Sequence, residues 1–433
     1  MKHQPERKQP VLTIQVLKSG HQSSTLKLMR PDLPDMVVKK TRWGHANLAG
    51  YYQRYYQALE YFKGHLQRSD SLRKDTEVLT KAFTILFTTG KALFRRLFQD
   101  SEDSTDSMAK LREITNYLRN YIEPPYVSEH HSYSQIGVIE VIMENFTDII
   151  PVECLVIPGL KAEVRGLPDV IRTASRVLGF SFIIKRVIGI AGQSQKRVLN
   201  NVPRLPLKYF SNNSIKGAKD ERAFFERYRD KGYFCLDGPW PQEDTEFTVE
   251  DFVRYLFRPD VGFGQTGKTD TGERPLDEIH HLSCHAHTDE KHPWKSSLRL
   301  AGNQRITLEE MEEHLADLEC SGTEHKTKEM PLVFFNACET AEMTPKGMIS
   351  FPQYFLLDNK NCGFIGTETG IPGSFASEFC QQFYLHLLRG CGVGEAIFEA
   401  RHTMLRRYNN PLGILYTSYV DPYLKVARAA DSI

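Results

Sequence analysis

The sequence has almost no net charge, no long apolar run and no apolar N-terminal segment. It holds 55 basic and 54 acidic residues, a formal charge of +1, so no overall field favours nucleic acid or a membrane as a direct partner. The most apolar stretch, residues 177–192, is interrupted by Lys185 and Arg186 and is shorter than the roughly 20 apolar residues that span a bilayer. Residues 1–10 are basic and polar and lack the apolar core of a secretory signal. We therefore expect a cytoplasmic location.

The sequence also lacks closely paired cysteines and repeats. Its eight cysteines are scattered and form no Cys-x-x-Cys pair, so we expect mostly reduced, buried thiols, with one candidate exception. No helical repeat of about 34 residues is visible. No cofactor is expected.

The composition is that of an ordinary globular protein, 40% hydrophobic and 25% charged, and the length allows two or three sub-domains. We expect an N-terminal hairpin and helical region over residues 1–125 and a second domain over residues 126–433. The N-terminal strands are predicted over residues 11–16 and 26–28, and the helices over residues 51–66, 78–98 and 111–121. From about residue 138, short apolar runs alternate with helical segments, and one strand is predicted over residues 153–157. This alternation predicts an α/β sheet with helices on both faces.

Two of the predicted strands end in reactive residues. Residues 279–287 read IHHLSCHAH, and residues 332–340 read LVFFNACET. Open α/β sheets place their sites at the carboxyl ends of strands. A thiol with the ordinary pKa of about 8.5 is mostly protonated at neutral pH and needs a base. We therefore predict Cys338 as a nucleophile and His285 as its general base.

Peptide cleavage also needs N–H donors directed at the oxyanion of the tetrahedral intermediate. The backbone N–H groups of Ala286 and Cys338 are the candidates. Both lie where a predicted strand runs into a turn of small residues, which lets a substrate backbone approach closely.

Two other interpretations of these segments remain open. A cysteine after an apolar strand is more often a small buried core residue than a catalytic one. The histidines and cysteine of residues 280–292 could instead bind zinc. The candidate zinc ligands are His280, His281, Cys284, His285, His287 and His292. Strand alternation divides this set, with His281 and His285 on one face and Cys284, which we expect in the core, on the other.

The segments HHLSCHAH and VFFNACETA resemble the two signatures of CHAT-domain peptidases, relatives of caspases and separase. His285 precedes Cys338 by 53 residues (338 − 285), close to the roughly 50 residues between base and nucleophile in caspases. Further stretches resemble other parts of the family pattern: residues 150–155, residues 362–367, Phe383-Tyr384, residues 394–396 and Ala400-Arg401. Together they cover roughly residues 130–425.

The resemblance implies a caspase-like, mostly parallel sheet flanked by helices and a cysteine endopeptidase that uses the dyad His285 and Cys338. It also implies a role in bacterial defence or programmed cell death, with a gasdermin-like pore former as a candidate protein substrate and a regulatory or sensor protein as a candidate partner. A catalytically inactive caspase-like scaffold is the alternative. The family commonly has glycine after the catalytic histidine, where this chain has Ala286, so the oxyanion hole departs from the pattern.

The sequence is less informative about the substrate pocket. Metacaspases, which favour basic P1 residues, carry an aspartate two positions before the nucleophile, whereas this chain has the neutral Asn336. Asp289, Asn336 and Glu339 are the candidates for the pocket, although acidic residues in loops are usually solvated. Glu153 is expected to be a buried structural acid rather than a catalytic one.

Overall fold

The computed structural model describes most of the chain, in sixteen segments. These are residues 9–18, 23–41, 45–67, 71–99, 105–122, 136–144, 150–159, 167–189, 196–201, 204–241, 248–257, 276–289, 291–300, 305–320, 330–338 and 350–427. The chain forms two compact units. The first comprises residues 1–191 and 397–414, and the second comprises residues 192–396 and 415–433.

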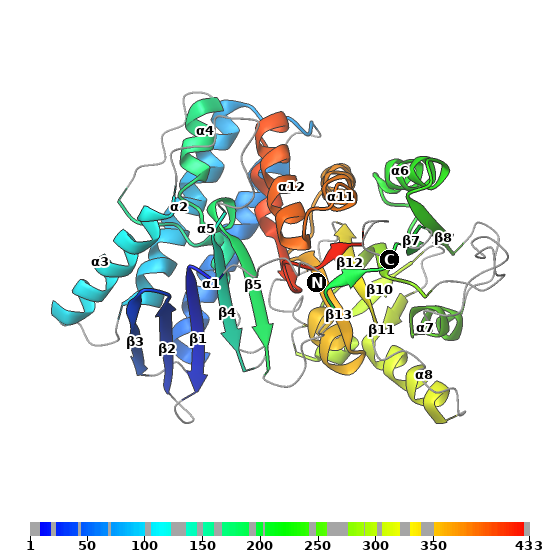
Figure 1. Ribbon diagram of the computed structural model, residues 1–433, viewed down its shortest axis with the longest axis horizontal. Helices are drawn as coiled ribbons and strands as arrows, with labels where there is room; N and C mark the ends of the chain where they lie inside the picture. Colours follow the sequence, from blue (N-terminus) through cyan, green and yellow to red (C-terminus); the bar gives the residue numbers. More distant parts are fainter. Residues whose placement is uncertain are drawn as a thin grey trace, which may run out of the picture. The chain divides into compact units, whose positions relative to one another are not determined.

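The first unit contains a five-stranded sheet in the order β3-β2-β1-β4-β5 (Figure 1). Its strands are β1 (Leu12–Lys18), β2 (Ser23–Arg30), β3 (Leu33–Thr41), β4 (Val138–Met143) and β5 (Ile183–Ile188). The first three strands form an antiparallel meander, while β1, β4 and β5 are parallel. The predicted hairpin is present, but it gains a third strand and joins a larger sheet. Because β4 and β5 pair with this N-terminal part, the first unit extends beyond the expected boundary at residue 125.

Helices of the first unit follow the predicted amphipathic segments. They are α1 (His45–Gln67), α2 (Thr76–Phe98), α3 (Thr105–Asn120), α4 (Leu167–Ala174), α5 (Leu178–Ser181), most of α12 (Val393–Tyr408) and most of the 3-10 helix η7 (Pro411–Leu415). In α2, residues three or four positions apart, including Leu79, Phe83 and Leu86, are buried, as expected for a helix with one apolar face. The helix begins after Asp75, whose carboxylate accepts the Val78 N–H at 2.8 Å and so satisfies a free donor of the first turn.

The strand predicted over residues 153–157 is not formed. The segment is instead a 3-10 turn, η3 (Val152–Cys154), followed by a single bridge between Val156 and Val177. Glu153 is almost fully buried, and its carboxylate accepts hydrogen bonds from the guanidinium of Arg186 on β5, one of them at 2.5 Å. Glu153 is therefore a structural acid, and its side chain is committed to an ion pair in the interior of the first unit.

The second unit contains the chemistry-bearing strands. Its main sheet runs β8-β7-β9-β12-β13-β14, and the hairpin β10-β11 continues beside the end of β9. The strands are β7 (Leu205–Ser211), β8 (Phe234–Trp240), β9 (Ile279–His287), β10 (Ser297–Arg299), β11 (Arg305–Thr307), β12 (Met330–Cys338), β13 (Asn361–Thr367) and β14 (Tyr416–Tyr419). From β8 to β13 the main strands are parallel, and β14 is antiparallel to β13. A separate two-stranded sheet pairs β6 (Val198–Leu199) with β15 (Lys425–Val426).

Helices lie on both faces of this sheet (Figure 1). They are α6 (Ala218–Asp230) and α11 (Gly373–Leu388) on one face and α7 (Val249–Phe257) and α8 (Leu308–Cys320) on the other, with the shorter η4 (Pro293–Lys295), α10 (Ser350–Gln353) and η6 (Tyr354–Asp358).

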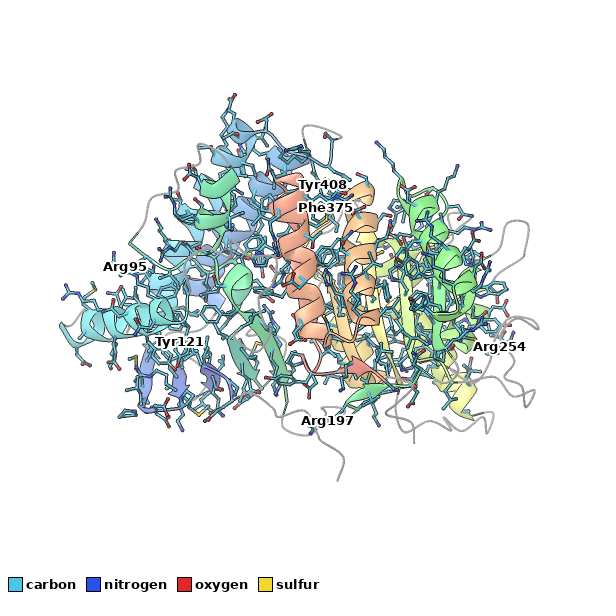
Figure 2. All side chains as sticks on the ribbon, turned by 45° about the horizontal axis from the view of Figure 1, so that its top comes forward. Arg95, Tyr121, Arg197, Arg254, Phe375 and Tyr408 are labelled. Atoms are coloured by element: carbon cyan, nitrogen blue, oxygen red, sulfur yellow. The ribbon has the colours of Figure 1, made fainter. Side chains whose placement is uncertain are left out.

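Alternation along β7 shows how the strands serve both helical layers. The Tyr209 ring lies 5.0 Å from Phe225 of α6, whereas the Phe210 ring lies 5.1 Å from Phe252 of α7. Arg254 of α7 keeps a partly exposed side chain that pairs with an aspartate of its own helix (Figure 2). The predicted class, an α/β fold with a mostly parallel sheet flanked by helices, is confirmed for this unit.

Two expectations about cysteines and membranes can be compared with the described residues. Of the seven cysteines whose side chains are described, five are buried, as predicted. None of the helices in the described segments combines the length and apolarity needed to cross a membrane.

Candidate active site

Two neighbouring parallel strands bring the predicted base and nucleophile to the same edge of the sheet. β9 and β12 pair in register from Leu332 opposite Ile279 to Cys338 opposite His285. β12 ends at Cys338, and β9 ends two residues after His285. The backbones of the two predicted catalytic residues are therefore directly opposite each other, at the carboxyl end of both strands.

The histidines of β9 are divided between the two faces of the sheet. The ring of His281 lies between the sheet and the α6–α11 layer, stacked on Phe334 with ring centres 5.1 Å apart. His280 faces the other layer, where its ring meets Phe210 edge-on and its Nε2 lies 3.5 Å from an Asp277 oxygen. Cys284 is fully buried and is therefore a core residue, and this burial raises the pKa of its thiol well above the ordinary value. The predicted division of the cluster is confirmed.

His285 itself is only half-buried, at the open end of β9. Its Nε2 lies 3.4 Å from the Ser214 hydroxyl oxygen. Burial lowers the pKa of His285 below its usual value, and the positive charge of Arg299 lowers it further. Arg299 is the register partner of His285 on β10. Both effects disfavour the imidazolium, so the ring is mostly neutral at neutral pH and can accept a proton.

The sequence analysis missed the loop that contacts His285. Residues 212–217 connect β7 to α6, and Asn212 and Ser214 of this loop form a hydrogen-bonded turn next to the histidine. The run Ser-Asn-Asn-Ser at residues 211–214 directly follows an apolar strand. Such small polar residues form turns through side-chain to backbone hydrogen bonds. That pattern, at the end of a strand next to β9, was the available signal.

A buried polar network lies beneath the strand ends. Glu221 of α6 accepts a hydrogen bond from the Asn336 amide at 2.7 Å and contacts His281 Nε2 at 3.1 Å. The Tyr416 hydroxyl donates to the Asn336 side-chain oxygen at 2.6 Å. His281 Nδ1 lies 3.1 Å from the Tyr384 hydroxyl. Asn336 has no exposed surface. Asn336 therefore lies on β12 with its side chain bonded inside this network, and it is not exposed to a substrate.

The candidate zinc ligands of residues 280–292 do not converge. Among the described residues, one different group could hold a metal, namely Glu221, His281 and Cys380, whose ligand atoms lie within 4.8 Å of one another. The carboxylate oxygens of Glu221 and both ring nitrogens of His281 have protein partners, so hydrogen bonds already account for these atoms. The network therefore joins α6 to β9 and β12 through side-chain hydrogen bonds.

Two other predicted site residues lie near the end of β9. Ala286 is buried and opposes Leu298 of β10. Asp289 is partly exposed, and its carboxylate accepts the backbone N–H groups of His292 at 2.8 Å and Lys291 at 2.9 Å. These bonds lower the pKa of Asp289, so its carboxylate is charged at neutral pH. Glu339 lies outside the described residues.

Comparison with known proteins matches the part of the chain that contains this site. Residues 270–422 match the family model of the CHAT domain. The resemblance noted in the sequence is thereby confirmed over a segment that includes both His285 and Cys338.

Individual relatives match less of their own length. A probable protease of Vitiosangium sp. is 36% identical over 105 residues, which are 23% of this chain and 13% of that protein. Two crystal structures of the Saccharomyces cerevisiae separase–securin complex align with 96% of this chain and 30% of the separase chain, at 10% identity and TM-scores of 0.44 and 0.45. This chain therefore spans less than a third of the length of the proteins that it matches.

Proposed function

We propose that this chain, which contains a CHAT-domain match, is a cysteine endopeptidase with Cys338 as nucleophile and His285 as general base. The observation that carries the proposal is the register of β9 and β12, which sets the backbones of these two residues opposite each other. Register partners on neighbouring parallel strands have side chains on the same face of a sheet. We therefore propose that the thiol proton of Cys338 is transferred to the imidazole of His285.

The reaction follows from the chemistry of this pair. His285 takes the proton of the Cys338 thiol, and the thiolate attacks the carbonyl carbon of the scissile peptide. The resulting oxyanion is proposed to accept hydrogen bonds from the backbone N–H groups of Cys338 and Ala286. When the tetrahedral intermediate collapses, the C–N bond breaks and the imidazolium protonates the leaving amine. Water, deprotonated by His285, then hydrolyses the thioester and releases the carboxylic acid and the free thiol.

The lowered pKa of His285 supports the role of base. A base that is neutral at the working pH is available for proton transfer, and burial and Arg299 both move His285 in that direction.

The substrate-binding proposals follow from position alone. Asp289 follows β9 after the proposed base, and its charged carboxylate suits a cationic or hydrogen-bonding substrate group. Glu339 is kept as a pocket candidate because it directly follows the proposed nucleophile in the sequence. Asn336, being fully buried, is proposed to hold β12 in place.

The biological role that we propose depends on the family resemblance. It is cleavage of a protein partner, for example a gasdermin-like pore former, in bacterial defence or programmed cell death in the cytoplasm, under control of a regulatory or sensor protein. Co-expression of the chain with such a pore former tests this role, with cleavage of the pore former as the expected result.

The peptidase proposal is tested with a peptide library that varies the P1 residue and with an electrophilic peptidyl acyloxymethyl ketone. Cys338→Ala is expected to abolish hydrolysis, and mass spectrometry is expected to find the probe on Cys338. Cys320→Ala is the matched control, because Cys320 is an exposed free thiol on α8 whose loss leaves the dyad intact. Hydrolysis that survives in Cys338→Ala contradicts the proposal. A folded chain that neither hydrolyses any peptide nor reacts with the probe supports the scaffold alternative.

A further inference from the structure

The proposed base has a second hydrogen-bonding group on its far nitrogen. Ser214 Oγ lies 3.4 Å from His285 Nε2 and 2.6 Å from the Asn212 side-chain oxygen. A serine hydroxyl has one proton to donate and two lone pairs to accept with. The direction of these two bonds therefore depends on whether Asn212 accepts or donates.

Two hydrogen bonds from the side-chain nitrogen of Asn212 determine which way its amide group points. Its side-chain nitrogen donates to two backbone carbonyls, Arg299 at 3.0 Å and Leu300 at 3.1 Å. The residue is almost fully buried, and exchanging its oxygen and nitrogen would place an acceptor against two acceptors. The backbone N–H of Asn212 also donates to the Ser283 carbonyl at 2.8 Å, which ties the loop to β9. The Asn212 side-chain oxygen is therefore held toward Ser214.

The Ser214 hydroxyl must then donate to Asn212 and accept from the histidine. The Asn212 oxygen also accepts the Ser214 backbone N–H at 2.9 Å, which holds the serine in the turn. With its only proton directed at Asn212, the Ser214 oxygen presents a lone pair to His285 Nε2. That contact is favourable when Nε2 carries the hydrogen, and a hydrogen bond at one ring nitrogen of a histidine determines which nitrogen is protonated.

We infer that Asn212 and Ser214 are positioning residues that hold neutral His285 in its Nε2–H tautomer and leave Nδ1 as the basic nitrogen. His285 Nδ1 is buried and has no hydrogen-bond partner within the described segments, as expected of a nitrogen kept for another group. The inference rests on the proposed function in one respect, that the group served by Nδ1 is the Cys338 thiol.

The hydrogen bonds from Asn212 through Ser214 to His285 keep the same direction throughout the proposed reaction. The thiol proton moves to Nδ1 while the Nε2–H···Oγ hydrogen bond stays in place, and this bond becomes stronger once the ring is charged. Ser214 therefore stabilises the imidazolium without touching the substrate.

The tautomer is measured directly by ¹⁵N NMR of the full chain with labelled histidine, at a pH above the pKa of His285. The signals are assigned with His285→Gln. We expect the Nε2–H form in the native chain, a shift toward Nδ1–H or a mixture in Ser214→Ala, and the native form in Ser214→Thr, which keeps the hydroxyl. Lys219→Ala, an exposed substitution in the first turn of α6, is the control and should leave the tautomer unchanged. An Nδ1–H form in the native chain, or a tautomer unaffected by Ser214→Ala, overturns the inference.

Alkylation of Cys338 by iodoacetamide separates this inference from the proposed function. We expect Ser214→Ala to slow alkylation about tenfold, as for loss of one hydrogen bond to a charged group, and Ser214→Thr to restore it. If His285→Gln leaves the alkylation rate of Cys338 unchanged, the dyad is wrong, whatever the tautomer. If His285→Gln slows alkylation but Ser214→Ala does not, the dyad stands and the positioning role of Ser214 fails.

Discussion

Glu221 connects α6 to β9 and β12, the two strands that end near His285 and Cys338, and replacing it with alanine should cost much more stability than replacing it with glutamine. Its carboxylate has no exposed surface and contacts the Asn336 amide of β12 and His281 Nε2 of β9. Glu221→Ala leaves both partners buried without their acceptor. Each unsatisfied buried polar group costs about 1–3 kcal/mol, so the two together predict a loss of about 2–6 kcal/mol, before any cost of the cavity.

Glu221→Gln keeps the shape and removes only the charge. The amide oxygen can still accept from Asn336, and the new amide N–H can donate to His281 Nε2 if the ring hydrogen moves to Nδ1, beside the Tyr384 hydroxyl. Both contacts survive in neutral form, so the expected loss is about 1 kcal/mol, the size of a single ordinary hydrogen bond.

Urea unfolding followed by tryptophan fluorescence measures this difference. Trp240 is buried on β8 and Trp294 lies in η4, so two of the three tryptophans report on the second unit, which contains Glu221. Equal losses in Glu221→Ala and Glu221→Gln would mean that the charge, rather than the pair of hydrogen bonds, is the source of the stability. A loss below about 1 kcal/mol in Glu221→Ala would refute the reasoning, since it is less than one unsatisfied group should cost.

Two further predictions concern charges elsewhere in the chain. Glu153→Gln removes the carboxylate that pairs with the buried guanidinium of Arg186 and should cost about 3–5 kcal/mol. Glu140→Gln, which breaks a partly exposed pair on the neighbouring strand, should cost about 1 kcal/mol or less. Thermal unfolding followed by circular dichroism compares the two variants, and similar losses would contradict the assigned burial. Arg299→Gln removes a positive charge that lowers the pKa of His285, so that pKa rises. Because only the neutral ring is a base, the acidic limb of the pH–alkylation profile of Cys338 should move to higher pH, and a limb that stays in place or moves to lower pH would contradict the electrostatic assignment.

Local patterns predicted much of the second unit because they reflect short-range constraints. Apolar runs ending in His285 and Cys338 predicted two strands with reactive ends, and the period of two along a strand predicted that His281 and Cys284 would face opposite sides. Both follow from backbone geometry within one segment. In the first unit, the helical spacing of apolar residues in α2 likewise predicted the position of that helix to within two residues at each end.

Other expectations depended on partners far away in the sequence. Residues 153–157 have the apolar character of a strand, but residues 152–154 form a 3-10 turn. Glu153 in this turn pairs with Arg186, which lies 33 residues away in the sequence. Asn336 suited a substrate pocket by its distance from Cys338, yet its amide is bonded to Glu221, 115 residues earlier.

The strand ends, the 53-residue spacing (338 − 285) and the residue types are all local information, and they were enough to identify His285 and Cys338 as candidate reactive residues. The folded chain was needed to show that β9 and β12 are neighbours in register and that Ser214, 71 residues before His285, lies beside its ring. Hydrogen bonds between strands and side-chain contacts across a sheet depend on how distant segments pack, and no periodicity within either segment specifies that pairing.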